Sequence, residues 1–360
     1  MMIQYFLRRL FASVPVLFGI LLVTFALARS IPGDPCRAIL GEKATEQVCS
    51  RFIREKGLDK PILTQFGIYI SDMARGNFGE SFRLGMPVTR LLIERLPTTF
   101  ELSVSALIVS IIFGVPLGII SAVRHNSWLD VVTMVWANIG VSMPVFWLGL
   151  MLAYVFSLML KDTPFWLPPS GRLTPGISDT PFYELWGWTV PETGLWAGFL
   201  NFTGRLYIFN ALITGNWELL KDSITHLILP TIALATIPMA IIARMSRSAM
   251  LEVLGQDYIR TARAKGLRWF PVVMKHAFRN SLLPIVTVIG LSFGSLLGGA
   301  VLTETIFGLS GVGRTLYEAI TARDYGIVQA FTVVIAFIFV LINLIVDISY
   351  AYLDPRIRLD

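Results

Sequence analysis

Charged residues are scarce in this sequence. Asp, Glu, Lys and Arg make up 15% of its 360 residues, whereas soluble globular domains carry about 25%. The shortfall arises from long uncharged runs, and hydrophobic residues reach 54% of the chain. Uncharged runs of about 18 residues or more predict transmembrane helices. The composition therefore excludes an ordinary soluble domain and indicates an integral membrane protein.

Sequence motifs of catalysis and metal binding are also missing. The chain has no Gly-x-x-x-x-Gly-Lys-Ser/Thr phosphate loop, no His-Glu-x-x-His and no Cys-x-x-Cys. Its three histidines, His125, His226 and His276, stand far apart, and an isolated histidine is more often structural than a ligand. We therefore predict no catalytic residue, no cofactor site and no metal site on this chain.

Six apolar runs are long enough to cross a bilayer as helices. They cover about 10–28, 102–123, 131–160, 225–243, 282–303 and 327–350. Nothing alternates like the strands of a barrel, so the predicted fold class is an all-α membrane protein with six transmembrane helices. The third run is long for one crossing and holds Pro144, which predicts a kink or a tilt there.

Basic residues set the orientation. They precede the first run (Arg8, Arg9), separate the second from the third (Arg124), follow the fourth (Arg244 to Arg279) and follow the sixth (Arg356, Arg358). Six crossings place all four segments on one side, and the positive-inside rule makes that side cytoplasmic. Both termini are then cytoplasmic. The net charge of +6 is explained by this bias, and we predict no nucleic-acid partner.

The runs divide the chain into one membrane domain with two outward elaborations. We predict an N-terminal transmembrane helix (1–29), an outward region with short helices at 45–56 and 62–74 (30–99), a membrane core (100–353) and a cytoplasmic tail (354–360). The core contains an outward insertion at about 161–224 and a cytoplasmic loop at about 244–281. Tryptophans of the insertion suit a membrane–water interface, and an irregular cap on the helix ends is favoured over a ligand-binding subdomain.

The first run has features of a signal peptide, because Arg8-Arg9 precede it and Ala26-Leu27-Ala28 follow. Its apolar stretch of about 18 residues exceeds the usual 7–15, so we expect a retained helix. Cys36 and Cys49 both lie in the outward region. An oxidising compartment permits a disulfide between them, and two free thiols are equally consistent with the sequence.

Ionisable side chains are nearly absent within the runs. Asp347, which we expect to cap or pair near the interface, and His226 are the exceptions. Ion-coupled carriers usually keep charged relays within the bilayer. Energy for transport is therefore expected to come from outside this chain.

One cytoplasmic stretch is basic and also contains residues with small side chains. Tyr258 to Lys265 favours a helix, Asp257 is expected to cap its start and Gly266 to end it. Ala262 and Ala264 would let another surface approach the backbone closely. We expect Trp269-Phe270-Pro271 to turn the chain before a second short helix at 272–278. Docking of an acidic partner and an amphipathic helix on anionic lipid both fit this pattern.

The run from Tyr258 to Gly266, followed by His276, Arg279-Asn280 and Pro284, resembles the cytoplasmic coupling loop of ABC importer permeases. Arg260-Thr261-Ala262 stands where most of that family has Glu-Ala-Ala, a variant of the dipeptide/oligopeptide/nickel branch. Further segments resemble that branch in order and spacing: Arg8-Arg9, Pro32-Gly33-Asp34-Pro35, Gly57-Leu58-Asp59-Lys60-Pro61, Gly76-Asn77-Phe78-Gly79, Arg124, Met143-Pro144, Glu304-Thr305-Ile306-Phe307, Gly311-Val312-Gly313, Arg323-Asp324-Tyr325 and Asp354-Pro355-Arg356. The similarity spans nearly the whole chain, is closest to the first membrane subunit of dipeptide permeases, and is weakest at 165–220.

The resemblance implies a type I ABC importer permease fold in a bacterial cytoplasmic membrane. It also implies a second homologous permease, two ATPase subunits that carry ATP and Mg²⁺, and an extracytoplasmic solute-binding protein. The implied ATPase-coupling residues are Asp257, Tyr258, Arg260, Thr261, Ala262, Arg263, Ala264, Lys265, Gly266, His276, Arg279 and Asn280. The implied candidates for contact with the binding protein are Glu304, Gly311, Gly313, Arg323 and Asp324.

Three alternatives stay open at this point. Importers of nickel, glutathione, opines and oligosaccharides share the scaffold, and dipeptides are preferred because the overall resemblance is closest there. A carrier or channel that works without an ATPase is a second hypothesis, which the lack of intramembrane charge disfavours. A membrane enzyme is a third, but Glu304, Asp347 and His226, its only candidate residues, are scattered along the chain.

Overall fold

The computed structural model describes residues 2–30, 36, 44–55, 57–81, 83–191, 194–322 and 324–353. Within these residues every regular element is a helix, and the one β-bridge joins Glu80 to Pro87. In chain order the elements are α1 (Met2–Ser30), α3 (Glu46–Glu55), α4 (Ile62–Ala74), α5 (Val88–Val123), α6 (Trp128–Ser142), α7 (Val145–Ala153), the π-helix η1 (Tyr154–Met159), α8 (Phe182–Leu185), α9 (Leu195–Gly204), α10 (Tyr207–Thr214), α11 (Trp217–Leu254), α12 (Asp257–Ala264), α13 (Trp269–Pro271), the π-helix η2 (Val272–Phe278), α14 (Arg279–Gly299), α15 (Val301–Ile306), α16 (Val312–Thr321) and α17 (Tyr325–Leu353). The predicted all-α fold class is confirmed.

The membrane-spanning helices are those expected from the apolar runs. Within the described residues, five helices are long and apolar enough to cross a membrane, and the count is six if α6 and the segment after its bend form one span. Two helices extend well beyond their predicted bounds: α5 begins at Val88 and α11 covers Trp217–Leu254. Their extensions carry charged residues, which a search for uncharged runs leaves out although the helical backbone continues.

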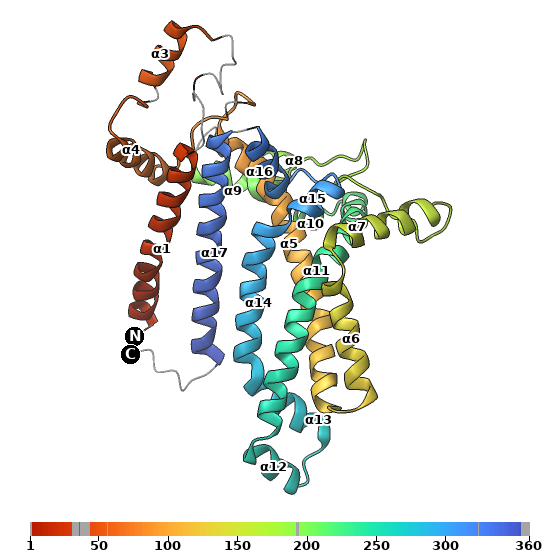
Figure 1. Cartoon of the computed structure of the whole chain (residues 1–360). Helices are drawn as coiled ribbons and strands as arrows, with labels where there is room; N and C mark the ends of the chain where they lie inside the picture. The colour runs from red at the N-terminus through yellow and green to blue at the C-terminus, as the bar shows by residue number, and fades with distance from the viewer. Residues whose placement is uncertain are drawn as a thin grey trace.

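The third apolar run bends sharply at Pro144, so the kink predicted there is confirmed. The helices before and after Met143–Pro144 meet at 95°, so α7 leaves the bundle sideways (Figure 1). Proline lacks the backbone N–H of a helical bond, and the residue before it is pushed into the extended region. Met143 has that conformation, with φ −101° and ψ 133°. The bend is sharper than a simple kink, and it divides the run into α6, whose 15 residues rise about 22 Å, and the helical segment after Pro144.

The central contact of the bundle is a seam of small residues between α5 and α11. Ser110, Gly114, Gly118 and Ala122 recur at every fourth position of α5 and therefore share one face. The Ser110 hydroxyl donates to the Ala235 carbonyl across the seam at 2.9 Å. A Cβ atom on Gly118 would lie 2.5 Å from the Ala243 carbonyl oxygen. Small side chains thus let the two backbones touch, as is common in membrane helix pairs.

The outward region 30–99 is attached to α1. Phe66 and Tyr69 of α4 pack their rings against Phe25, with centroid distances of 5.2 and 5.7 Å. The predicted short helices are confirmed as α3 and α4. In the structure Cys36 is disulfide-bonded to Cys49 on α3, with 5.3 Å between the Cα atoms. The turn predicted at 31–35 and the tail 354–360 lie outside the described residues.

The insertion at 161–224 is tied to the outer part of α5 by a buried carboxylate. Glu101 accepts hydrogen bonds from the Arg172 guanidinium and from the Ile208 backbone N–H, the latter at 2.8 Å. The Arg172 guanidinium in turn lies over the Tyr207 ring, 3.8 Å from its centroid. Short helices α8, α9 and α10 complete the insertion at the end of the bundle opposite α12 (Figure 1).

Asp347 on α17 forms an ion pair with Arg9 on α1 at 3.2 Å. This pair lies where the two helices pack together, so the expectation that Asp347 pairs is confirmed. His226 is buried, and its Nδ1 lies 2.9 Å from the Asp222 carbonyl oxygen. Glu304, Asp347 and His226 sit on three different helices with separate partners, an arrangement that gives no support to the hypothesis of a membrane enzyme.

Candidate functional site: the short helix α12

The short helix α12 forms one tip of the molecule. It follows α11 after only Gly255 and Gln256, and Figure 1 shows it at the end of the bundle farthest from α3 and α4. Two of its residues, Ile259 and Ala262, are buried, while its other side chains are exposed. We call the exposed residues 257–258, 260–261 and 263–266 the docking surface.

The start of α12 differs from the sequence prediction. Asp257 is the first helical residue, and Gln256 occupies the N-cap position with no side-chain cap hydrogen bond among the described residues. The prediction that Asp257 caps the helix is therefore wrong by one position. Its carboxylate still lies in the first turn, where the helix dipole favours negative charge, and pairs with Arg260 at 3.5 Å. Both side chains are strongly exposed, so this pair adds little stability.

The end of α12 depends on Gly266. The Gly266 N–H donates to the Arg263 carbonyl at 3.0 Å, and the Leu267 N–H donates to the Ala262 carbonyl at 3.3 Å. This pair of bonds is the Schellman motif, which places its C′ residue in the left-handed region. Gly266 has φ +74°, so the predicted helix-ending role of this glycine is confirmed. A Cβ atom on Gly266 would meet no described atom within 4 Å, and its surface is open to a partner.

The docking surface is basic. Arg260, Arg263 and Lys265 are exposed on it, against the single carboxylate of Asp257. The next segment adds two exposed aromatic rings, Trp269 and Phe270. An acidic partner with an apolar rim would complement this combination of charges and rings.

The polypeptide after the docking surface is more regular than predicted. The expected turn at Trp269-Phe270-Pro271 is instead the start of a helix, since α13 continues through η2 and α14 without interruption. Pro271 is tolerated because the first turn of a helix needs no donor at that position. The second helix predicted at 272–278 is confirmed as η2. It continues directly into the spanning part of α14.

An apolar cluster attaches α12 to the bundle. Ile259 and Ala262 pack with Ala122 at the end of α5, Met250 on α11 and Val273 on η2. All five side chains are buried, and burial of a Leu- or Ile-sized side chain contributes about 1.5–3 kcal/mol. The short helix α12 therefore packs against three other elements, α5, α11 and η2.

The remaining predicted coupling residues lie beside this cluster. His276 is on η2, and Arg279 and Asn280 are exposed at the start of α14. The Asn280 amide donates to the His276 carbonyl at 2.7 Å and to the Tyr258 hydroxyl at 3.2 Å. This second bond links α14 directly to α12.

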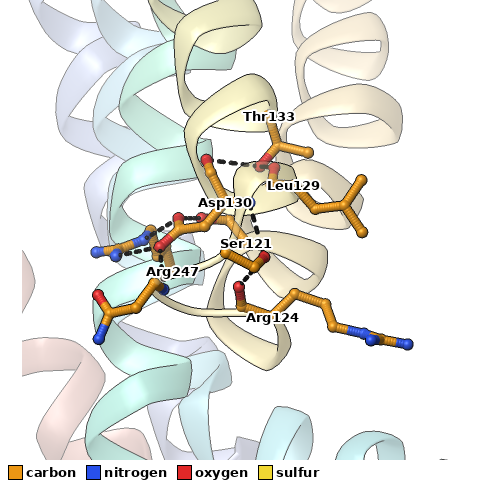
Figure 2. Close-up of polar contacts among 8 residues, drawn as sticks. Ser121, Arg124, Leu129, Asp130, Thr133 and Arg247 are labelled. Carbon is orange, nitrogen blue, oxygen red and sulfur yellow. Dashed lines mark hydrogen bonds and ion pairs between the residues drawn. The ribbon is translucent and has the colours of Figure 1, made fainter.

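A charged site that the sequence prediction missed joins α6 to α11, about three turns of α11 before α12 begins (Figure 2). Arg247 on α11 donates two hydrogen bonds to Asp130 on α6, at 2.9 Å to Oδ1 and 2.8 Å to Oδ2. The Ser121 hydroxyl of α5 and the Asn126 backbone N–H donate to the same carboxylate. We call Asp130, Arg247, Ser121 and Asn126 the clamp. A sequence signal was present, because Ser127-x-x-Asp130 is a helix-start pattern and the Ser127 hydroxyl accepts from the Asp130 N–H.

The residues proposed to contact a binding protein are buried instead. Glu304, Gly311, Gly313 and Asp324 have little or no exposed surface. Arg323 lies outside the described residues. Glu304 accepts from the Thr99 hydroxyl at 2.6 Å and from the Arg314 N–H at 2.8 Å, and a Cβ atom on Gly311 would lie 2.3 Å from its carboxylate. In this conformation Glu304 and the two glycines hold α15 and α16 against α5, and contact with a binding protein stays a prediction.

Asp324 has a similar internal role. Its carboxylate accepts from the Ser81 hydroxyl at 2.6 Å and from the Arg83 N–H at 3.2 Å. It also precedes α17 and accepts from the Ile327 N–H at 3.4 Å, as an N-cap residue does. The side chain thus joins the outward region to the start of α17.

Glu304 gives a pH-dependent prediction. Burial raises the pKa of this carboxyl to about 7, against hydrogen bonds from Thr99, Arg314 and Gly313 that lower it. The folded chain then holds a proton that the unfolded chain releases above its ordinary pKa of 4.5. The contribution of Glu304 to the free energy of unfolding is therefore fully present below about pH 4.5. It is lost as pH rises through 7, by up to about 3 kcal/mol. The thermal midpoint of the purified chain should decrease as the pH is raised from 5 to 8, and Glu304→Gln should flatten that dependence; an unchanged slope in the variant would contradict the assignment.

Within the described residues, no group of three or more His, Cys, Asp or Glu is placed to hold a metal ion. The site on α12 is an exposed basic helix with an open glycine, and it packs against α5, α11 and η2.

Comparison with known proteins covers the whole chain. The family model described as "Binding-protein-dependent transport system inner membrane component" matches residues 114–359, and the model of the N-terminal part of such membrane components matches residues 2–103. Dipeptide transport system permease protein DppB of Alkalihalophilus pseudofirmus is 46% identical over 99% of this chain and 100% of its own. The di/tripeptide transport system permease protein DppB of Pseudomonas aeruginosa and the dipeptide permease DppB of Escherichia coli are each 42% identical, over 99% of both chains.

Proposed function

Because the chain belongs to the family of binding-protein-dependent transport system inner membrane components, we propose that it is a permease subunit of an ATP-driven importer of dipeptides. The observation that carries the substrate class is the full-length similarity to permeases named for dipeptide transport, at 42–46% identity. A relative of the same similarity is named for di- and tripeptides, so short peptides of two or three residues are the substrate range to test.

The chain acts as one part of a complex. Permeases of this family work with an ATPase and with a solute-binding protein. We further propose a heterodimer with a second homologous permease, two ATPase subunits that bind ATP and Mg²⁺, and no catalytic step on this chain. The solute path then lies between the two permeases.

The docking surface of α12 is the proposed contact with one ATPase. Three observations support this role: α12 projects from the bundle, Gly266 is open on its surface, and Arg260, Arg263 and Lys265 offer charge to an acidic groove. ATP binding would close the ATPases, displace α12 and favour one conformation of the spans over the other. ATP thus shifts the population between two states of the permease by its differential affinity for them.

The tip that bears α12 is proposed to be cytoplasmic. The turn between α5 and α6, the end of α11, the start of α1 and the end of α17 lie toward this side of the bundle (Figure 1). The first two of these segments carry Arg124 and Arg244, as the positive-inside rule requires. The outward region 30–99 and the insertion 161–224 then face the extracytoplasmic space. The exposed side chains of α9, Leu195, Trp196 and Phe199, are of the kind found at that membrane surface.

Reconstitution of the complex tests the function. The chain, its partner permease, the ATPases and the binding protein are incorporated into proteoliposomes, and uptake of a labelled dipeptide is measured with and without ATP. We expect uptake only when ATP and every subunit are present, with competition by unlabelled di- or tripeptides and not by Ni²⁺ or oligosaccharide. Uptake in liposomes that lack the ATPases would contradict the proposal.

A further inference from the structure

We propose that the clamp makes the α5–α6 turn move as one body with α12 during transport. Asp130 and Arg247 are thus positioning residues for the coupling of ATP hydrolysis to uptake. This inference rests on the proposed docking of α12 to an ATPase, and it adds the route by which the motion reaches the spans.

The clamp joins three helices at one carboxylate (Figure 2). Each Asp130 oxygen accepts two bonds: Oδ1 from Ser121 and from Arg247 Nε, and Oδ2 from the Asn126 N–H and from Arg247 Nη2. Ser121 belongs to α5, Asp130 to the first turn of α6, and Arg247 to α11. Two parallel bonds from a planar guanidinium fix orientation as well as distance. Rotation of α11 relative to α6 would break both bonds.

The clamp also lies on the direct path from α12 into the bundle. Arg247 is on the last turns of α11, about three turns before α12 begins. The connection between these helices is short, and Gly255 keeps a right-handed conformation with φ −78°. The apolar cluster of α12 reaches Ala122 at the end of α5, the residue that follows Ser121. The hydrogen bond from Ser121 to Asp130 and this cluster therefore both hold the end of α5.

The clamp holds the turn between α5 and α6 more than it holds the helices together. Asn126 has φ +59°, an uncommon conformation for a residue other than glycine, and its N–H donates to Asp130 at 3.0 Å. The seam of small residues holds α5 to α11 along its length, whereas α6 is only 15 residues long and ends at the Pro144 break. Loss of the carboxylate would free the turn and the start of α6 while α5 stays on α11.

The test compares ATP hydrolysed per peptide imported in the reconstituted complex. Asp130→Asn and Arg247→Gln should each raise this ratio by about tenfold, which is within the usual range of coupling between sites, because hydrolysis continues while uptake falls. The conservative variant Asp130→Glu, which keeps a carboxylate at this position, should retain more of the coupling than Asp130→Asn. As a matched control, Arg314→Gln removes an exposed ion pair with Glu318 on α16, at the end of the molecule opposite α12. This variant should leave the ratio unchanged. Equal ratios in wild type and in both single variants would overturn the inference.

A distance measurement on a chain with an intact clamp tests the proposal even if the clamp variants fail to fold. Spin labels are attached to His125→Cys in the turn and to Thr261→Cys on α12, both exposed positions. The native cysteines do not react, because they are bonded to each other. The distance between the labels should stay the same in nucleotide-free and ATP-trapped complexes. A distance that changes between these two states would show that the turn and α12 move independently.

Failure of this inference is separable from failure of the proposed function. A thiol cross-linker between Thr261→Cys and the ATPase reports the docking alone. If that cross-link forms and the coupling ratio of the clamp variants matches wild type, only the clamp hypothesis is wrong. If the cross-link is absent in the otherwise wild-type complex, the docking itself is wrong.

Discussion

Replacement of Gly266 by valine is expected to reduce ATP-driven peptide uptake by about tenfold or more while the chain stays inserted in the membrane. Gly266 ends α12 at φ +74°, a conformation that costs an ordinary L-residue about 1–2 kcal/mol and a β-branched residue more. The added side chain would meet no described neighbour within the chain. The effect therefore arises from distortion of the helix end and from bulk on the docking surface. Uptake and ATP hydrolysis by the reconstituted complex measure it.

Gly255 provides the matched control for this substitution. It lies at the other end of the same short segment, has φ −78°, and its added Cβ atom would approach the Glu252 carbonyl oxygen only to 3.5 Å. Gly255→Ala should therefore leave uptake near the wild-type level. Wild-type uptake by Gly266→Val would contradict the role assigned to the end of α12.

Replacement of Gly118 by leucine is expected to prevent the chain from folding. A Cβ atom at this position would lie 2.5 Å from both the Ala243 carbonyl oxygen and the Ser246 Cβ atom. Backbone atoms cannot rotate away, so α5 and α11 would have to separate. We expect a loss of more than about 3 kcal/mol, a large fraction of the stability of a folded chain. The yield of monodisperse protein in detergent and its thermal midpoint report the outcome.

Gly19 on α1 is the corresponding control. A Cβ atom there meets no atom within 4 Å in the described part of the chain, and leucine suits a lipid-facing position of a spanning helix. Gly19→Leu should be purified in normal yield. Similar yields of Gly118→Leu and Gly19→Leu would show that the seam does not need its glycine.

Much of the fold follows from local sequence patterns. Spans can be recognised because a bilayer requires long uncharged helices. The end of α12 could be predicted because glycine is the residue that most readily takes the left-handed conformation after a helix. The seam of α5 had a signal too, in small residues at every fourth position from Ser110 to Ala122. Its recognition requires a search for helix-packing patterns as well as for hydrophobicity.

Other features depend on three-dimensional contacts that a linear pattern does not contain. Proline predicts either a kink or a break, and the choice at Pro144 depends on what α7 packs against, including Phe307 near Gly149. Glu304 and Asp324 resemble surface residues by type, but partners distant in sequence, Thr99 and Ser81, bury them. The partner of Asp130 is likewise far along the chain, since Arg247 lies on another helix. Residue type alone therefore could not separate contact residues from internal ones.

Site-specific cross-linking of α12 tests the account most directly. In the complete complex, Thr261→Cys on α12 and Leu195→Cys on α9 are each treated with a short thiol cross-linker; both positions are exposed and lie at opposite ends of the molecule. We expect Thr261→Cys to join an ATPase subunit, with a yield that changes when ATP is bound, and Leu195→Cys to form no such product. A cross-link from Leu195→Cys to the ATPase, or labelling of Thr261→Cys by an impermeant reagent added outside intact cells, would contradict the account.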